Sequence, residues 1–105
     1  MNSTYSVAAG YFDEVRAIVE QGISIVFEER ENLYMGGRYF NFRGSENERI
    51  RLLDNTTLDF DGEVLYPEYG QYSYVLIVEG VDFCEYTEEK VKNNPRISLL
   101  GCECY

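Results

Sequence analysis

Four consecutive apolar residues, Val75-Leu76-Ile77-Val78, constrain the fold of this chain more than any other feature of its sequence. They lie within the stretch Tyr72–Glu79, which follows a loop-like segment at Pro67–Gln71. A short, continuous apolar run predicts a β-strand that is covered on both faces. The chain has 105 residues, 45% of them hydrophobic, which is enough for one domain with one ordinary core. We therefore expect residues 1–105 to form a single domain.

An amphipathic α-helix is predicted near the N-terminus, over Tyr11–Gln21. Its apolar residues recur at the spacing of one helical face, at Phe12, Val15, Ile18 and Val19. Asp13 and Glu14 stand in the first turn, where the helix dipole favours anions. Gly22 follows as a natural C-terminal stop.

Two strands are predicted after this helix. Ile23–Glu29 is rich in β-branched and aromatic residues, and Arg30-Glu31-Asn32 can form a turn. Leu33–Arg43 then continues as a strand, with Phe40 and Phe42 on one face and Tyr39, Asn41 and Arg43 on the other. Gly36-Gly37 interrupts it, which indicates a bulge or a sharp bend.

The middle of the chain predicts a turn, a strand and a loop. Gly44–Asn47 reads as a turn, and Asn55–Gly62 reads as a loop. Between them, Ile50 and Leu52 alternate with Arg49 and Arg51, as in a half-exposed strand.

The C-terminal third is less regular. Val81–Tyr86 fits either a strand or one side of a helix, and we favour an extended segment to Tyr86. A short second helix is expected near 87–93, ended by Asn94-Pro95, and Arg96–Leu100 reads as a last strand. The expected class is α+β: an N-terminal helix packed on a mainly antiparallel sheet of about five strands.

Charge is distributed very unevenly along the sequence. The chain has 19 acidic and nine basic residues, giving a net charge of −10. No Lys or Arg occurs within residues 52–89, so the whole net charge arises there, from ten carboxylates. These are Asp54, Asp59, Asp61, Glu63, Glu68, Glu79, Asp82, Glu85, Glu88 and Glu89. Five tyrosines accompany them, and tyrosine supplies large contact area with a polar tip at interfaces. The pattern favours an acidic binding face over a merely solvated one.

The residue types of the chain disfavour an enzyme active site and a metal-binding site. The chain has no His, the commonest general base and metal ligand. The segment from Thr57 to Glu68 spaces its acidic residues like a calcium-binding EF-hand loop, but Thr57 stands where the first ligand should be Asp. A carboxylate dyad such as Asp59 with Glu79 stays open, although nothing distinguishes it from any other pair of acids. We expect no enzyme activity, no metal site and no cofactor.

The arginines 38, 43, 49 and 51 form the one cationic region of the sequence. Because Glu46 and Glu48 lie among them, cross-strand ion pairs are the expected explanation.

Compartment is inferred from the cysteines and the N-terminal residues. Cys84, Cys102 and Cys104 are odd in number, which favours a reducing cytosol, with one buried thiol and two in a loose tail. Met1–Phe12 carries no basic residue, so no secretory signal is expected, and no stretch is long and apolar enough for a membrane span.

One resemblance is visible. The segment Tyr34–Phe42, followed by Asp61-Gly62-Glu63 and the Tyr72–Val78 strand, resembles small immunity proteins of bacterial contact-dependent inhibition and related polymorphic toxin systems. The likeness lies in size, acidity and general pattern over most of the chain, and it carries no functional residue with it. It implies a protein that binds one cognate toxin domain, often an RNase or DNase, and blocks its active site or substrate cleft.

The sequence thus predicts a cytoplasmic inhibitor of a basic protein, a toxin nuclease domain in the first place, with no direct contact to nucleic acid or membrane. The alternative is a phage-encoded mimic of nucleic acid, directed at a CRISPR or restriction complex, which would use the same acidic face. The residues expected to bind the partner are Asp54, Asp59, Asp61, Glu63, Tyr66, Glu68, Tyr69 and Tyr72.

Overall fold

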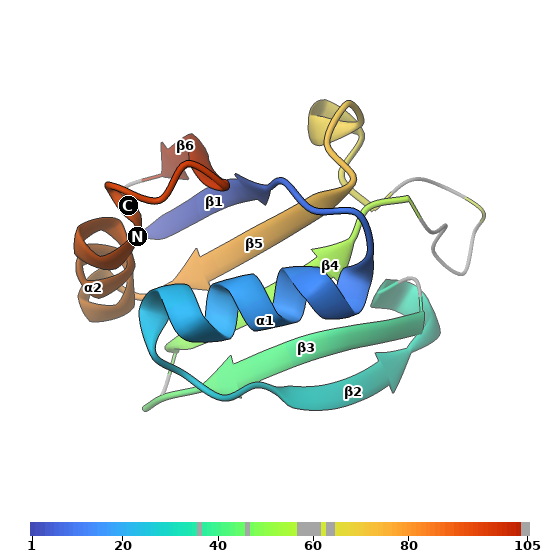
Figure 1. The fold of residues 1–105 in the computed structure, drawn as a ribbon. Helices are drawn as coiled ribbons and strands as arrows, with labels where there is room; N and C mark the ends of the chain where they lie inside the picture. The colour runs from blue at the N-terminus through green and yellow to red at the C-terminus, as the bar shows by residue number, and fades with distance from the viewer. Residues whose placement is uncertain (36, 46, 57–61, 63–64, 104–105) are drawn as a thin grey trace.

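A computed structural model describes residues 1–35, 37–45, 47–56, 62 and 65–103, apart from the side chain of Leu33. Six strands form one sheet in the order β2-β3-β4-β5-β1-β6, and every pair of neighbours is antiparallel (Figure 1). The strands are β1 Asn2–Val7, β2 Glu28–Asn32, β3 Gly37–Arg43, β4 Arg49–Asp54, β5 Tyr74–Glu79 and β6 Ile97–Glu103. The two α-helices are α1 Phe12–Ile23 and α2 Val81–Val91. The α+β class is confirmed.

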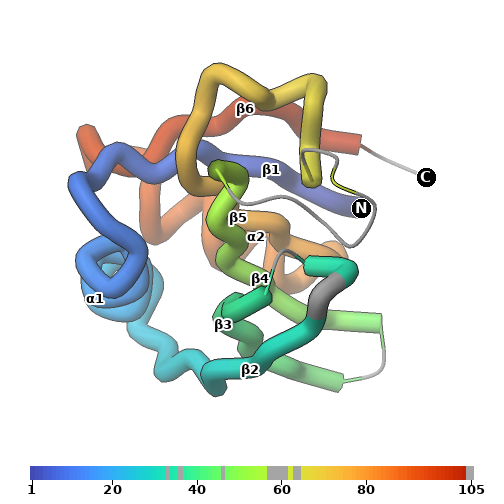
Figure 2. The backbone as a smooth tube through the Cα atoms, turned by 90° about the vertical axis from the view of Figure 1, so that its right-hand side faces the viewer, coloured from blue at the N-terminus to red at the C-terminus, as the bar shows by residue number. Residues whose placement is uncertain are grey.

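Helix α1 lies across one face of the sheet, and α2 lies beside the end of β5 (Figures 1 and 2). The inward residues of α1 are those that the helical spacing predicted, except that Ile18 is only partly buried. The helix runs past Gly22 to the fully buried Ile23, and Ser24 ends it in the left-handed conformation at φ 57°. Burial of Ile23 in the core offsets the poor helix propensity of the glycine.

Both faces of β5 are covered, as its apolar run predicted. Leu76 and Val78 face the main core, which α1 and α2 close. Val75 and Ile77 face a smaller core on the opposite side, together with Leu53 of β4. No described part of either α-helix contributes to this second core; loop residues and tyrosines cover it. We call this side of the sheet the helix-free face.

Strand β1 was not predicted from the sequence. It pairs with β5 on one side and β6 on the other, so it lies inside the sheet. Its residues alternate regularly: Ser3, Tyr5 and Val7 are buried, and the residues between them are half-buried. The N-terminal helix therefore follows a first strand, and the sheet has six strands where about five were expected.

The predicted strand at Ile23–Glu29 and the turn at Arg30-Glu31-Asn32 are both wrong. Strand β2 begins at Glu28 and includes the predicted turn. All its residues are exposed, because β2 is an edge strand that pairs only with β3. Charged side chains on an edge strand hinder its pairing with other chains. A strand made of them has no hydrophobic alternation, so it cannot be recognised as a strand from its sequence pattern.

The single strand expected at Leu33–Arg43 is divided. A 3₁₀ turn, Leu33–Met35, precedes β3, which starts at Gly37 with φ +103°. The bend predicted at the glycine pair is therefore present at Gly37. The turn predicted at Gly44–Asn47 connects β3 to β4, with the Gly44 amide donating to the Glu48 carbonyl at 3.0 Å.

The prediction of an extended segment at Val81–Tyr86 is wrong, because these residues form the first half of helix α2. The residues buried from α2 are Cys84, Thr87 and Val91, three to four positions apart as on one helical face. Gly80 precedes the helix with φ +107°, a conformation that lets the chain leave β5 directly into the helix. The expected short helix near 87–93 is thus the second half of a longer one, and the last strand extends to Glu103.

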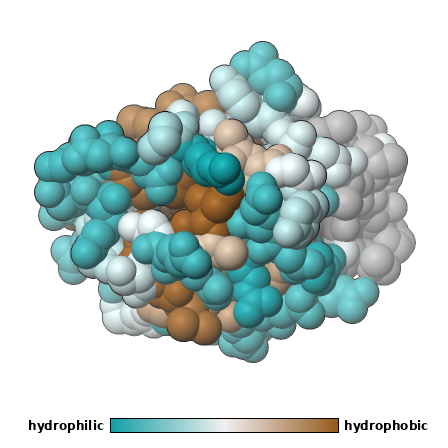
Figure 3. All heavy atoms as spheres, viewed as in Figure 1, coloured by the Kyte–Doolittle hydropathy of each residue, from teal (hydrophilic) through white to brown (hydrophobic). Residues whose placement is uncertain are grey.

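The outer surface over α1 is largely hydrophilic, with apolar patches between the polar groups (Figure 3). Within the described chain, neither helix has the length and apolar character that a bilayer crossing needs.

Candidate protein-binding surface

The segment 65–73, which leads into β5, carries three tyrosines in close succession: Tyr66, Tyr69 and Tyr72. A short 3₁₀ turn, Pro67–Tyr69, folds it back on itself, with the Tyr69 amide donating to the Tyr66 carbonyl at 2.9 Å. Proline at the first position of the turn presets the backbone. We call residues 65–73 the tyrosine turn.

One buried amide side chain holds the tyrosine turn in place. Asn55, directly after β4, donates through Nδ2 to the carbonyl oxygens of Tyr66, Tyr69 and Tyr72 at 3.3, 3.0 and 3.3 Å. Its Oδ1 accepts from the Tyr66 amide at 3.0 Å. The Asn55 backbone amide also donates to the Ser73 carbonyl at 2.7 Å. A single residue therefore fixes the backbone at all three tyrosines.

The three tyrosine side chains pack against the smaller core of Leu53, Val75 and Ile77 and stay half-buried. Burial raises the pKa of the Tyr66 hydroxyl above its ordinary value. Each of these side chains is therefore partly packed against the smaller core and partly exposed to solvent.

Two described carboxylates accompany the tyrosines, one before the tyrosine turn and one within it. Asp54 is half-buried and accepts hydrogen bonds from the amide and hydroxyl of Thr56, which closes a tight turn after β4. Glu68 lies within the tyrosine turn itself and is exposed.

Five of the eight residues predicted to bind a partner are described, and the structure brings them together: Asp54, Tyr66, Glu68, Tyr69 and Tyr72. The other three, Asp59, Asp61 and Glu63, lie outside the described residues. Asn55 was missed because the sequence reads it as ordinary loop. Its one visible signal is its place directly after a strand, where an amide side chain often bonds nearby backbone.

The described carboxylates of residues 52–89 do not share one surface. Asp54 and Glu68 lie at the start of β5, with the tyrosine turn. Asp82, Glu85, Glu88 and Glu89 belong to α2, at the other end of that strand (Figure 1). Glu79, the last residue of β5, pairs with Arg49 and Arg51.

A groove of about 490 Å³ runs from the tyrosine turn onto the helix-free face. Its lining includes Tyr66, Glu68 and Tyr69 of the tyrosine turn, together with Arg49, Arg51 and Glu79 of the strands. The groove places aromatic, acidic and cationic groups on one concave surface, as a mixed protein interface requires.

The structure describes only some of the residues that the sequence analysis considered for metal binding and for thiol chemistry. Most of the calcium-loop frame, including Asp59 and Asp61, lies outside the described residues. Among the described residues, no three potential ligands gather in a way that could hold a metal ion. Cys84 is buried and Cys102 exposed, both as free thiols, but Cys102 belongs to strand β6 and not to a loose tail. Cys104 is outside the described chain.

Comparison of the chain with models of protein families, with curated proteins and with solved structures finds no match. Function is therefore inferred from the surface itself.

Proposed function

We propose that this protein is a cytoplasmic immunity-type inhibitor, which binds and neutralises a cognate basic toxin domain, a nuclease, through the tyrosine turn and its flanking carboxylates. The observation that carries the proposal is the bracing of this turn by Asn55. Its four hydrogen bonds hold three half-exposed aromatic side chains in one arrangement before any partner arrives.

Bracing of this kind matters because ordering loops and side chains on association costs free energy. Tyrosine has few rotatable bonds and a large contact area, so a fixed tyrosine surface binds with little further loss of entropy. Tyr66, Tyr69 and Tyr72 are therefore suited to act as the buried anchors of an interface.

Charge supports a basic partner. Asp54 and Glu68 flank the tyrosines, and the intervening sequence adds Asp59, Asp61 and Glu63 without a single base. A surface of one sign speeds the approach of an oppositely charged protein and suppresses wrong partners. Nucleases present cationic clefts for phosphate backbones, and carboxylates can occupy such clefts in place of phosphates.

The test is affinity purification from the native host, followed by binding kinetics and a nuclease assay with the protein that is captured. The site variant reverses Asp59, Asp61 and Glu63 to Lys. The matched control reverses three exposed carboxylates of α2, Glu85, Glu88 and Glu89, and so changes the net charge by the same amount.

We expect a basic nuclease domain that loses activity on binding. The site variant should slow association about tenfold or more and reduce its salt dependence, whereas the α2 variant should change it much less. Capture of a CRISPR or restriction complex would show that the protein is a nucleic-acid mimic instead. Equal effects of the two variants would contradict the assignment of Asp59, Asp61 and Glu63 to the binding surface.

A further inference from the structure

The helix-free face carries a cluster of arginines on three neighbouring strands. Arg30 comes from β2, Arg43 from β3, and Arg49 and Arg51 from β4. Arg43 lies directly opposite Arg49 in the β3–β4 register. Like charges at directly opposite positions destabilise a sheet unless another group compensates them.

The carboxylates nearby compensate these arginines only in part. One oxygen of Glu79 accepts from Arg49 Nε at 3.1 Å and from an Arg51 terminal nitrogen at 2.6 Å. Arg51 is only 9% exposed, yet its Nε has no hydrogen-bond partner in the described chain. Arg43 forms no ion pair with any described residue. The cross-strand ion pairs expected from the sequence are therefore present at Arg38, which pairs with Glu29 of β2, and at Arg49 and Arg51. They do not account for Arg43.

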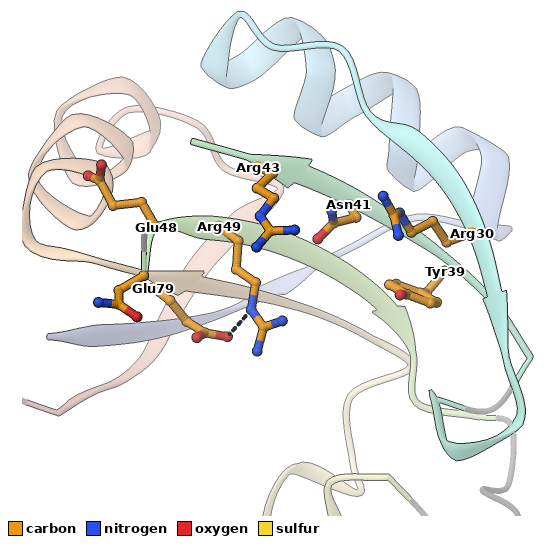
Figure 4. A pocket seen from close by; sticks show the side chains of 8 residues that line it. Arg30, Tyr39, Asn41, Arg43, Glu48, Arg49 and Glu79 are labelled. Atoms are coloured by element: carbon orange, nitrogen blue, oxygen red, sulfur yellow. Dashed lines mark hydrogen bonds and ion pairs between the residues drawn. The ribbon is translucent and has the colours of Figure 1, made fainter. Parts of the chain in front are cut away.

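A cavity of about 330 Å³ opens beside these side chains. Figure 4 shows Arg43, Arg49 and Arg30 on the same side of the sheet, with Asn41 between Arg43 and Arg30 and the ring of Tyr39 beside Arg30. The dashed line marks the one ion pair drawn there, between Arg49 and Glu79. Arg43 and the terminal nitrogens of Arg49 keep donors that these contacts leave unused.

We propose that this cavity binds a phosphate group, with Arg43 and Arg49 as its principal ligands. A phosphate between the two guanidinium groups would relieve their repulsion and accept several of their N–H donors at once. The Asn41 amide lines the same cavity and can supply a further donor. Free phosphate and the phosphate of a nucleotide share this chemistry, and the site does not depend on the proposed function.

The net charge of −10 does not prevent such binding. Exposed charges separated by more than about 8 Å are largely screened at physiological salt. Three arginines and two carboxylates, Glu48 and Glu79, are among the described residues that line the cavity. The balance of these nearby groups therefore decides affinity for an anion, and the remote carboxylates of α2 contribute little.

The test is an NMR titration of the ¹⁵N-labelled protein, read at the backbone amides and the arginine Nε groups. Inorganic phosphate, pyrophosphate and ATP are added in turn, with acetate and sodium chloride at matched ionic strength as reference anions. The variants are Arg43→Gln and, as a control with the same charge change, Arg96→Gln. Arg96 is exposed and faces Glu14 of α1 at 3.8 Å.

We expect saturable shifts at Arg43, Arg49 and Asn41 with the phosphate compounds and none with chloride. Arg43→Gln should weaken binding about tenfold or more, and Arg96→Gln less than about twofold. Arg43→Lys, which keeps the charge but loses the planar fork of donors, should fall between wild type and Arg43→Gln and serves as a second variant.

Several results would overturn the site: no saturable shift, shifts centred on another face, or equal weakening by Arg43→Gln and Arg96→Gln. Acetate binding as tightly as phosphate would refute the phosphate assignment. Tighter binding of ATP than of pyrophosphate would support a nucleotide as the ligand, and equal binding would support the free anion.

Discussion

The side chain of Asn55 bonds to backbone groups 11 to 17 residues further along the chain. It is 4% exposed, so water cannot replace these hydrogen bonds if the amide is removed. At the scale of single residues, the tyrosine turn thus depends on one polar group that does not itself face a partner.

We expect Asn55→Ala to lower the free energy of unfolding by about 2–3 kcal/mol, because it leaves buried carbonyls without donors. Urea denaturation followed by circular dichroism measures this. Asn93→Ala is the matched control, since Asn93 is exposed, and it should change stability by less than about 0.5 kcal/mol. Similar small losses for both variants would show that Asn55 does not hold the turn.

At the scale of the elements, α2 shows how a junction residue decides secondary structure. Val81, Phe83 and Glu85 alternate as in a strand, and local pattern alone favoured that interpretation. Gly80 bends the chain out of the sheet, and the Cys84 amide then donates to the Gly80 carbonyl at 2.9 Å in the first helical turn. Burial of Cys84, Thr87 and Val91 against the main core favours the helix over an exposed strand.

The same helix contains a buried hydroxyl group, that of Thr87, without a hydrogen-bond partner among the described residues. The residue is fully buried. Valine has nearly the same shape and replaces the hydroxyl with a methyl group.

Thr87→Val should therefore raise the free energy of unfolding by about 1 kcal/mol, measured by urea denaturation. Thr87→Ser keeps the hydroxyl and removes the methyl group, so it should lower stability by about the same amount. A loss of stability in Thr87→Val would show that the hydroxyl does have a partner in solution.

At the scale of the whole molecule, both hydrophobic cores include tyrosines, whose hydroxyl groups can ionise at alkaline pH. Burial raises the pKa of Tyr5 to about 12 and also raises the pKa of Tyr66 and of Tyr74. Tyr5 and Tyr74 belong to the main core, and Tyr66 covers the smaller one. Both cores therefore resist ionisation of their tyrosines.

Alkaline pH should destabilise the protein for this reason. Below the ordinary tyrosine pKa of about 10, Tyr5 is protonated in both states and its contribution to stability is complete. Above it, the unfolded chain loses the proton first, so the free energy of unfolding falls by about 1.4 kcal/mol per pH unit for this residue until pH reaches about 12.

Denaturation curves between pH 9 and 12 measure this fall, and Tyr5→Phe provides the comparison. The variant has no proton to lose at this position, so its stability should decline less steeply than that of the wild type. Parallel pH profiles for the two proteins would contradict the assignment to Tyr5.

The fold class, the position of α1, the burial of β5 on both faces and the acidic character of residues 52–89 can all be inferred from the amino-acid sequence. These features depend on hydrophobic periodicity and composition, which are local. The positions of β1 inside the sheet and of β2 at its edge, and the turn of the chain into α2 at Gly80, follow only from the tertiary structure.

The tertiary structure also determines which charged side chains lie close together. The acids of the tyrosine turn and of α2 belong to one acidic stretch of the sequence but lie at opposite ends of β5, whereas Arg43 and Arg49 lie directly opposite each other on the neighbouring strands β3 and β4. Strand register and long-range hydrogen bonds such as those of Asn55 depend on how the whole sheet pairs, and no local pattern encodes them.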